Sequence, residues 1–331
     1  MPKPTLLLSQ EQIKGLITMK EVVEAVEKTF KGMGDGTVVN PTKVLLDLGE
    51  TAEYPPYKGF MNAMPAYIGW LDSAGIKWAG GFLGERKQMG LPYITSLIML
   101  IDPKIGNFRA VLDGEYVTNL RTGSQTAVAL KYLWKKPEIK VSLYGAGMQG
   151  RTHTMAISEL FKITEIRVYD VNPETLKSYA EQMRKYVAGS IVLAKTPEEA
   201  SGGDVAICVT QSKDKFFKYE WFKPGTILVP IGSYQECDDD CILNADHIIV
   251  DHIGQTLHRG ALGNLVEKGK ISEKNIYGTI GEVIAGKKPL PDANKRLLTI
   301  LIGTGALDVA VATIAYNKAV EKGIGGTYEF V

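Results

Sequence analysis

The sequence of 331 residues lacks several features that would narrow its class. It has little excess charge, because 38 Lys and Arg residues oppose 37 Asp and Glu residues. Proteins that bind nucleic acid or anionic membranes carry a basic patch, so we expect neither partner. The sequence also has no apolar run long enough to span a membrane, and residues 1–8 lack the apolar core and cleavage site of a signal peptide. We therefore expect a cytoplasmic protein.

Cysteine is scarce as well, at three residues. Cys237 and Cys241 have the spacing C-x-x-x-C, but no second cysteine pair or nearby His-x-x-x-His accompanies them. A structural zinc site needs four such ligands, so we expect no metal. The four histidines form neither a metal-ligand spacing nor a Ser-His-Asp pattern. Reduced thiols in the cytoplasm are the simpler interpretation of the cysteines.

The chain is organised around the stretch from residue 139 to residue 170. An apolar run over 139–144 leads into Gly145-Ala146-Gly147-Met148-Gln149-Gly150, which has the pattern G-x-G-x-x-G. A segment with helical periodicity and a second apolar run follow, and the second run ends at Asp170. This order of strand, glycine turn, helix, strand and acid is typical of a dinucleotide-binding Rossmann domain.

Each glycine of this turn has a physical role in binding a dinucleotide. Gly145 permits the tight turn, Gly147 lets a pyrophosphate approach the backbone, and Gly150 lets the helix lie close to the strand. The N–H groups at the start of the helix, around Met148 and Gln149, point at the phosphates and favour their charge. The alternative is a glycine-rich turn in an α/β protein that binds no nucleotide.

Asp170 indicates which dinucleotide is bound. It lies twenty residues after Gly150, where a carboxylate can bind both hydroxyls of the adenosine ribose and would repel a 2′-phosphate. Residues 171–173 offer no Arg that could neutralise such a phosphate. We therefore predict NAD as the cofactor.

Hydrophobic periodicity predicts the elements around this stretch. Residues 9–33 are expected to form one helix capped by Ser9, and residues 118–134 another with Thr118 as a cap. Between them, short β-like runs separated by glycine indicate a mostly antiparallel sheet. After Asp170, strands and helices alternate, which predicts a parallel doubly wound sheet. The strands are expected at 191–193, 204–210, 225–232 and 247–251, and the helices at 173–187 and 196–200.

The last long segment, residues 304–322, is an apolar helix that lies far beyond the last predicted strand. We expect it to return to the first domain, which makes that domain discontinuous. The prediction is an α/β protein with two domains. A Rossmann dinucleotide-binding domain covers residues 121–303, and a discontinuous α+β substrate domain covers residues 1–120 and is completed by 304–331.

Three basic residues of the first domain are candidates for binding a substrate carboxylate. Lys77 lies inside an apolar β-like run, where a Lys is either an outward-facing strand residue or a buried functional one. Arg121 lies near the start of a helix; its planar fork suits a carboxylate, although an Arg in that place is more often solvated. Lys43 is a weaker candidate of the same kind.

These motifs resemble those of the ornithine cyclodeaminase/μ-crystallin family in order and spacing, and the resemblance covers nearly the whole chain. The motifs are Met64-Pro65-Ala66, Gly75-Ile76-Lys77, Leu112-Asp113-Gly114, Thr118-Asn119-Leu120-Arg121-Thr122-Gly123, the glycine turn, Gly305-Ala306-Leu307-Asp308-Val309-Ala310 and Gly323-Ile324-Gly325.

The resemblance implies a homodimer built through the first domain, with the site between the domains. It also implies that Lys77 and Arg121, with a basic residue near Lys43, hold the substrate carboxylate. The family usually has Arg where this chain has Lys43, and a Lys makes a point-charge contact in place of a fork.

A second departure concerns the reaction. Cyclodeaminases of the family carry an Asp two residues after the glycine that ends the 225–232 strand, and Tyr234 occupies that place here. Glu236 and Asp238 are near but out of register. Ring closure with loss of ammonia therefore has less support than oxidation of an amino acid or reduction of an imine.

The sequence thus predicts an NAD(H)-dependent oxidoreductase that acts on the C–N bond of a small α-amino or α-imino acid, of the alanine dehydrogenase or cyclic ketimine (pyrroline-carboxylate) reductase type. One alternative is an ornithine or lysine cyclodeaminase that uses Glu236 or Asp238, and another is a μ-crystallin-like NAD(P)H-binding protein with little turnover. The residues expected to take part are Lys77 and Arg121 in catalysis, these two with Lys43 and Tyr234 in substrate binding, and Thr122, Gly145, Gly147, Met148, Gln149, Gly150, Asp170, Thr210 and Ser233 in cofactor binding.

Overall fold

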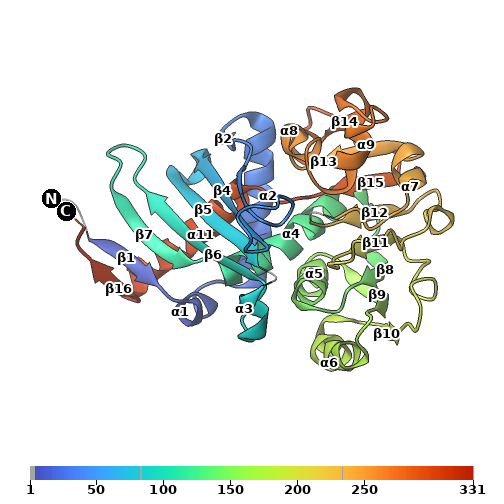
Figure 1. The fold of residues 1–331 in the computed structure, drawn as a ribbon, viewed down its shortest axis with the longest axis horizontal. Helices are drawn as coiled ribbons and strands as arrows, with labels where there is room; N and C mark the ends of the chain where they lie inside the picture. Colours follow the sequence, from blue (N-terminus) through green and yellow to red (C-terminus); the bar gives the residue numbers. More distant parts are fainter. Residues whose placement is uncertain (1–3, 83, 233, 331) are drawn as a thin grey trace. The chain divides into compact units, whose positions relative to one another are not determined.

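The computed structural model describes residues 4–82, 84–232 and 234–330. Its Cα positions divide the chain into two compact units, Met1–Arg121 with Thr304–Val331, and Thr122–Gly303. The boundary falls inside helix α4 (Glu115–Leu133). Each unit is built on a sheet of its own (Figure 1).

The sheet of the first unit has the strand order β16-β1-β7-β6-β5-β4-β2, and β3 also pairs with β4. Neighbouring strands are antiparallel except β1 and β7, which run parallel. β1 and β16 lie side by side at one edge (Figure 1). The strands are β1 (Thr5–Leu8), β2 (Val38–Val39), β3 (Val44–Leu48), β4 (Gly59–Ile68), β5 (Ser73–Phe82), β6 (Ile94–Ile101), β7 (Phe108–Asp113) and β16 (Gly326–Tyr328).

One long apolar helix lies in the core of this unit. α11 (Gly305–Lys322) packs on β4, β5 and β6, and α2 (Met19–Asp35) packs on α11. Buried residues occur all around the first part of α11, as expected for a helix enclosed on several sides. The shorter helices of the unit are α1 (Gln10–Lys14), α3 (Glu85–Gln88) and the 3₁₀ turn η1 (Gly69–Leu71).

The segment 9–33 forms two helices, so the prediction of a single helix is wrong. α1 ends at Gly15, and α2 begins after Thr18. The Thr18 side chain accepts a hydrogen bond from the Glu21 N–H, and the Glu21 side chain accepts one from the Thr18 N–H. This capping box starts a new helix and thereby interrupts the first. Ser9 caps α1 as predicted.

The predicted start of α4 is also wrong. The helix begins at Glu115 and includes Thr118 in its body. The Asp113 carboxylate accepts hydrogen bonds from the N–H groups of Glu115 and Tyr116, at 3.1 and 3.3 Å. Asp113, and not Thr118 as predicted, therefore satisfies two of the orphan N–H groups at the start of the helix.

The second unit contains a sheet in which every pair of neighbours is parallel, in the order β10-β9-β8-β11-β12-β15-β13-β14. The chain order reverses between β8 and β11. In a doubly wound sheet, ligands bind beyond the carboxyl ends of the strands at such a switch point. The strands are β8 (Glu138–Tyr144), β9 (Lys162–Tyr169), β10 (Ser190–Leu193), β11 (Val205–Cys208), β12 (Ile227–Pro230), β13 (His247–Val250), β14 (Ile276–Thr279) and β15 (Leu297–Ile300).

The connections between these strands carry short helices and 3₁₀ turns, and α5 and α6 follow β8 and β9 (Figure 1). β11, β12 and β15 are buried along their whole length, as parallel strands covered on both faces are. The helical segments are α5 (Met148–Ser158), α6 (Pro173–Met183), η2 (Arg184–Tyr186), η3 (Tyr219–Trp221), α7 (Asp239–Leu243), α8 (Ile253–Thr256), η4 (Gly260–Leu262), α9 (Gly263–Glu267), η5 (Glu273–Asn275) and α10 (Ile280–Ile284).

The predicted fold class, a Rossmann-type sheet together with a discontinuous α+β unit, is confirmed. Other details differ. Residues 196–200 form a turn and not a helix. The strands β14 and β15 of this sheet, and β1 and β16 of the first, were not predicted. Across the described ranges, every helix is too short or too polar to cross a bilayer.

Candidate active site

Lys77, Arg121 and Asp308 form a buried ion cluster in the first unit. Asp308 Oδ2 lies 2.7 Å from Lys77 Nζ, and Asp308 Oδ1 accepts a hydrogen bond of 2.9 Å from Arg121 Nε. Thr118 Oγ1 accepts a hydrogen bond from Lys77 Nζ and donates one to Asp308 Oδ1, both at 3.3 Å. Lys77 is 2% exposed and Arg121 5%, so neither is the solvent-facing residue that the sequence pattern also allowed.

The alternation of β5 turns Lys77 toward α11. Lys77 pairs with Met64 of β4 and Ile98 of β6, which are both buried, whereas the next residue, Trp78, is half exposed. Successive side chains of a strand point to opposite faces, so Lys77 lies on the face that α11 covers. Asp308 lies in the first turn of α11 and meets Lys77 there.

Burial and like charge shift the pKa of Lys77. Burial, followed by the nearby charge of Arg121, lowers the pKa of Lys77 to about 8, although Asp308 opposes both. Burial alone would raise the pKa of Asp308, but the charges of Arg121 and Lys77 outweigh it and lower that pKa. Two cations therefore share one carboxylate, and the cluster carries a net positive charge while Lys77 is protonated.

Lys43 lies directly before β3 and is half-buried. Its neighbour Val44 pairs with Ala63 of β4. The same register continued by one residue sets Lys43 opposite Met64, which pairs in turn with Lys77. Lys43 and Lys77 thus lie two strands apart on the same row, about 10 Å at the usual strand spacing.

The glycine turn of the second unit joins the ends of three neighbouring strands. Gly145 has a φ of +104°, and its N–H donates to the carbonyl of Tyr169 at 2.8 Å. A Cβ on Gly145 would lie 2.9 Å from the carbonyl oxygen of Val209, and one on Gly150 would lie 2.2 Å from that of Gly145. Both glycines are therefore required by packing.

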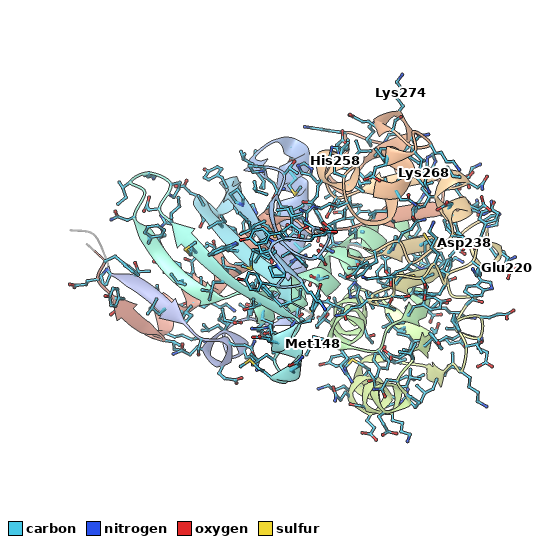
Figure 2. The ribbon with its side chains drawn as sticks, viewed as in Figure 1. Met148, Glu220, Asp238, His258, Lys268 and Lys274 are labelled. Carbon is cyan, nitrogen blue, oxygen red and sulfur yellow. The ribbon has the colours of Figure 1, made fainter. Side chains whose placement is uncertain are left out.

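Gly147 differs, because a Cβ there would meet nothing within 4 Å among the described residues. Gly147 is exposed at the start of α5, and Met148 extends from the same end of the helix (Figure 2). Gln149 is half-buried. An exposed turn with room above its backbone, at the N-terminus of an eleven-residue helix, fits a phosphate group.

Asp170 lies at the end of β9 and supports the same turn. Its Oδ2 accepts a hydrogen bond from the Ala146 N–H at 2.8 Å, and its Oδ1 accepts one from the Asn172 N–H at 2.9 Å. Each carboxylate oxygen can accept a second hydrogen bond, which leaves capacity for a ribose hydroxyl. The half-buried Asp170 thus both fixes the turn and remains within reach of a ligand.

Thr210 follows β11 at the carboxyl edge of the same sheet and is half-buried. Its N–H and its Oγ1–H both donate to Glu236 Oε1, at 2.8 and 2.6 Å. Tyr234, in the loop after β12, is half-buried, and Thr122 is buried in α4. The predicted contact of Ser233 with the cofactor lies outside the described residues.

Asp308 makes the closest contacts of the cluster, although it was not among the predicted site residues. A signal was present: Asp308 is the one charged residue of the apolar run from Gly305 to Ala312. A charge in such a run is almost never buried without a partner, so the pattern predicts a buried cation beside Asp308.

The parallel sheet, its switch point, the glycine turn and the acid at the end of β9 define the second unit as a dinucleotide-binding domain of the Rossmann type. The chain as a whole belongs to the ornithine cyclodeaminase/mu-crystallin family, because the model of that family matches residues 3–323.

Relatives of known name match along nearly the whole chain. The alanine dehydrogenase of Archaeoglobus fulgidus is 35% identical over an alignment of 332 residues that covers 98% of each chain. A solved archaeal alanine dehydrogenase dimer with bound NAD superimposes with a TM-score of 0.90 at 34% identity, over 99% of this chain and 100% of that one. The Δ¹-pyrroline-2-carboxylate reductase of Thermococcus litoralis, solved with NADH and L-proline, has a TM-score of 0.89 at 30% identity, over 98% of this chain and 100% of that one.

Proposed function

We propose that this protein is an NAD(H)-dependent oxidoreductase that acts on the C–N bond of a small α-amino or α-imino acid. The cluster of Lys77, Arg121 and Asp308 carries the proposal, since it is a buried group of charges with a net positive sign. Buried charge is costly unless it is compensated, and a substrate carboxylate would compensate it. The cluster therefore suits an amino or imino acid in preference to a neutral substrate.

The second unit fits the cofactor. Gly145, Gly147 and Gly150, with the start of α5 at Met148 and Gln149, would hold the pyrophosphate of NAD, and Asp170 would bind the adenosine ribose. When bound, NAD(H) supplies the acceptor or donor of a hydride. Thr210 at the end of β11 would contact the same molecule, and we keep Thr122 and Ser233 as further candidates.

Relatives of this chain support the proposed chemistry. The alanine dehydrogenase and the pyrroline-carboxylate reductase both act on a carbon–nitrogen bond next to a carboxylate, and both solved neighbours hold NAD or NADH. The substrate of this chain is then expected to be a small acid of the same class, such as L-alanine or a cyclic imine.

The residues of the first unit would orient the substrate and handle its proton. Arg121 and Lys77 would bind the carboxylate and so fix the α-carbon, with Lys43 on the same row of the sheet as a further contact. Tyr234 remains a candidate for substrate binding. In the oxidative direction the α-carbon loses a hydride and the nitrogen loses a proton, which leaves an imine. Because its pKa is lowered to about 8, Lys77 can exchange that proton near neutral pH.

The cyclodeaminase alternative needs a carboxylate in place of the Asp that Tyr234 replaces. Glu236 is fully buried and accepts two hydrogen bonds from Thr210. Asp238, labelled in Figure 2, lies 3.3 Å from Lys218. Both candidates are thus engaged with the second unit's own residues, which favours simple oxidation or reduction.

We also propose that the protein is a homodimer, formed through the outer face of the first sheet, which is the face opposite to the one that α11 covers. One row of this face runs through Val44, Ala63, Trp78 and Leu97 on four adjacent strands. Val44, Trp78 and Leu97 are 66%, 50% and 54% exposed, an apolar row that a second copy would cover. The archaeal alanine dehydrogenase neighbour is a dimer.

The three free, buried cysteines suit the reducing cytoplasm, where we place the protein.

The absorbance of reduced nicotinamide tests the proposed reaction. Purified protein is mixed with NAD⁺ and small amino acids, or with NADH and cyclic imines, and ammonia is assayed in parallel. A change in NADH that depends on one of these acids supports the proposal. Ammonia from ornithine or lysine without net change in NADH would establish the cyclodeaminase instead. Binding of NADH without turnover of any acid would indicate a μ-crystallin-like binding protein.

A further inference from the structure

Glu236 joins the two loops that leave β11 and β12 at the carboxyl edge of the parallel sheet. The two strands are neighbours, and Glu236 lies between the end of β12 and the start of α7. Its backbone carbonyl accepts a hydrogen bond from the Phe217 N–H at 3.0 Å, and the Phe217 carbonyl accepts one from the Asp238 N–H at 2.9 Å. The loops are therefore held together through backbone and side chain alike.

The carboxyl group of Glu236 fixes the conformation of Thr210. Glu236 Oε1 accepts from both the N–H and the hydroxyl of Thr210. The Thr210 oxygen in turn accepts a hydrogen bond from the Ser212 N–H at 3.0 Å. Because its proton and a lone pair are both committed, the hydroxyl has one defined direction, and the backbone on either side of it is held as well.

Packing alone does not explain an acid at this position. Glu236 is fully buried, and its Oε2 has no hydrogen-bond partner within the described part of the chain. Cys208 and Cys237 lie near it, Cys241 lies near these two cysteines, and all three are fully buried. Burial raises the pKa of Glu236 to about 7, against the opposing effect of the Thr210 hydrogen bonds. An apolar side chain of similar volume would avoid this desolvation cost.

The strand order indicates which half of a dinucleotide Thr210 would contact. The glycine turn lies after β8, and Asp170, the proposed ribose ligand, lies after β9. A dinucleotide in a doubly wound sheet lies across the switch point, so its other half extends from the turn toward β11 and β12. Thr210 and the loop with Tyr234 occupy that side, where the nicotinamide half would lie.

We propose that Glu236 is a positioning residue, which through Thr210 sets the loop after β11 against the nicotinamide half of the cofactor. This inference rests on the proposed function, because it needs the dinucleotide to bind at the glycine turn. Glu236, which is fully buried, would not touch the cofactor. It acts by holding Thr210.

Two substitutions at Glu236 separate positioning from a general structural role. Glu236→Leu removes the acceptor and relieves the desolvation of the buried carboxyl group. The donors of the half-buried Thr210 can turn to water, so the melting temperature should change little. Glu236→Gln keeps an oxygen that can accept from Thr210 and should restore most of the function. Thr210→Val removes the hydroxyl donor from the other side of the same hydrogen bond. Thr210→Ser keeps it and is the control.

The readout compares NADH with ADP-ribose, which lacks the nicotinamide. In Thr210→Val, which loses one hydrogen bond to Glu236, we expect kcat and NADH affinity to fall about tenfold, and in Glu236→Leu, which loses both, at least as far, while ADP-ribose binding stays within about twofold. The double variant should lose no more than Glu236→Leu alone, because Thr210→Val breaks one of the two hydrogen bonds that Glu236→Leu removes. Glu236→Gln and Thr210→Ser should remain close to the wild type.

Wild-type kcat and NADH affinity in Glu236→Leu would overturn the inference. So would equal losses of NADH binding, ADP-ribose binding and melting temperature, since these indicate a structural role. Failure of the wild-type protein to bind either NADH or ADP-ribose would instead reject the proposed function. The three results are distinguishable in one set of titrations.

Discussion

The ammonium of Lys77 and the carboxylate of Asp308 form an ion pair of 2.7 Å in which both side chains are almost completely buried. Arg121 binds the other oxygen of the same carboxylate. Asp308 thus compensates two buried cations that lie on different elements of the first unit, β5 and α4. Its removal would leave both cations together in a medium of low polarity, where like charges repel strongly.

Asp308→Asn should therefore destabilise the fold severely. Breaking a buried ion pair by removing one partner costs about 3–5 kcal/mol, and we expect a loss of that size in the free energy of unfolding by urea. The matched control is Asp35→Asn, which breaks the exposed pair of Asp35 with Lys31 and should cost less than about 1 kcal/mol. If the two substitutions lowered the unfolding free energy equally, burial would not be the reason why the Asp308 ion pairs stabilise the fold.

The pKa of Lys77 predicts how substrate binding depends on pH. Lys77 is protonated below about pH 8 and loses its charge as the pH rises through that value, so the affinity for a carboxylate should fall above pH 8. A competitive carboxylic acid inhibitor without an amine, such as propionate, isolates this effect from the titration of the substrate nitrogen. Above pH 8 the inhibition constant of propionate should rise with pH, by no more than about tenfold per pH unit.

Lys77→Met is the control for this profile, because Met removes the charge and keeps a long apolar side chain. The variant should bind the inhibitor weakly at every pH, with a flat profile between pH 7 and about pH 9. Loss of the cation should lower kcat/KM for the amino acid about a hundredfold, as expected when one partner of a desolvated charge pair is removed. A pH profile that persists in Lys77→Met would assign the titration to another group.

The lowered pKa of Lys77 also makes the unfolding free energy depend on pH. A favourable ion pair would raise the pKa of a Lys, so the pH dependence expected here has the opposite sign. Its pKa in the folded protein lies below the ordinary value of 10.5, so the unfolded chain binds more protons between about pH 8 and that value. The unfolding free energy of the wild type should therefore rise over this range relative to that of Lys77→Met. Urea denaturation of both proteins at pH 8 and about pH 10 measures the difference, and a fall relative to the variant would contradict the lowered pKa.

Substitutions at two glycines of the turn should distinguish an effect on cofactor binding from an effect on folding. A Cβ on Gly147 meets no described atom within 4 Å, so Gly147→Ala should lower the unfolding free energy by less than about 1 kcal/mol, the scale of an N-cap change. The same Cβ would occupy space proposed for the pyrophosphate, and NADH binding should weaken about tenfold or more. Unchanged NADH affinity in Gly147→Ala would place the phosphates elsewhere.

Gly150→Ala is the partner experiment. Its Cβ would lie 2.2 Å from the carbonyl oxygen of Gly145, which belongs to the backbone and cannot rotate away. Overpacking of this kind costs about 1–3 kcal/mol, so this variant should lose stability as well as binding. Denaturation and NADH fluorescence measured on both variants test the distinction.

Local patterns were sufficient to predict the dinucleotide-binding fold. The glycine turn, Asp170 and the alternation of strands and helices are short-range features, and each reports a backbone requirement that one stretch of sequence satisfies by itself. Helix ends were predicted less well. Several residues near each helix start could cap it, and the sequence does not show which one does. The hydrogen bonds of the structure identify Thr18 for α2 and Asp113 for α4.

The ion cluster could not be derived from spacing. Asp308 and Arg121 are 187 positions apart, and no periodic pattern relates residues at that separation. The burial of Lys77 depends on which face of the first sheet α11 covers, and the sequence of β5 is consistent with either face. The engagement of Glu236 with Thr210 likewise depends on two loops meeting at the sheet edge.

The outer face of the first sheet gives a prediction about assembly. Trp78 is half exposed in the centre of the apolar row of Val44, Ala63, Trp78 and Leu97, so Trp78→Glu would place a charge inside the proposed dimer interface. Burying an unpaired charge opposes association, and the variant should be monomeric by sedimentation equilibrium while its circular dichroism is unchanged. Val320→Glu is the control, because Val320 is similarly exposed, at 55%, but belongs to α11, which packs on the sheet's other face. This control should sediment as the wild type does. A dimeric Trp78→Glu protein would show that the copies associate through another surface.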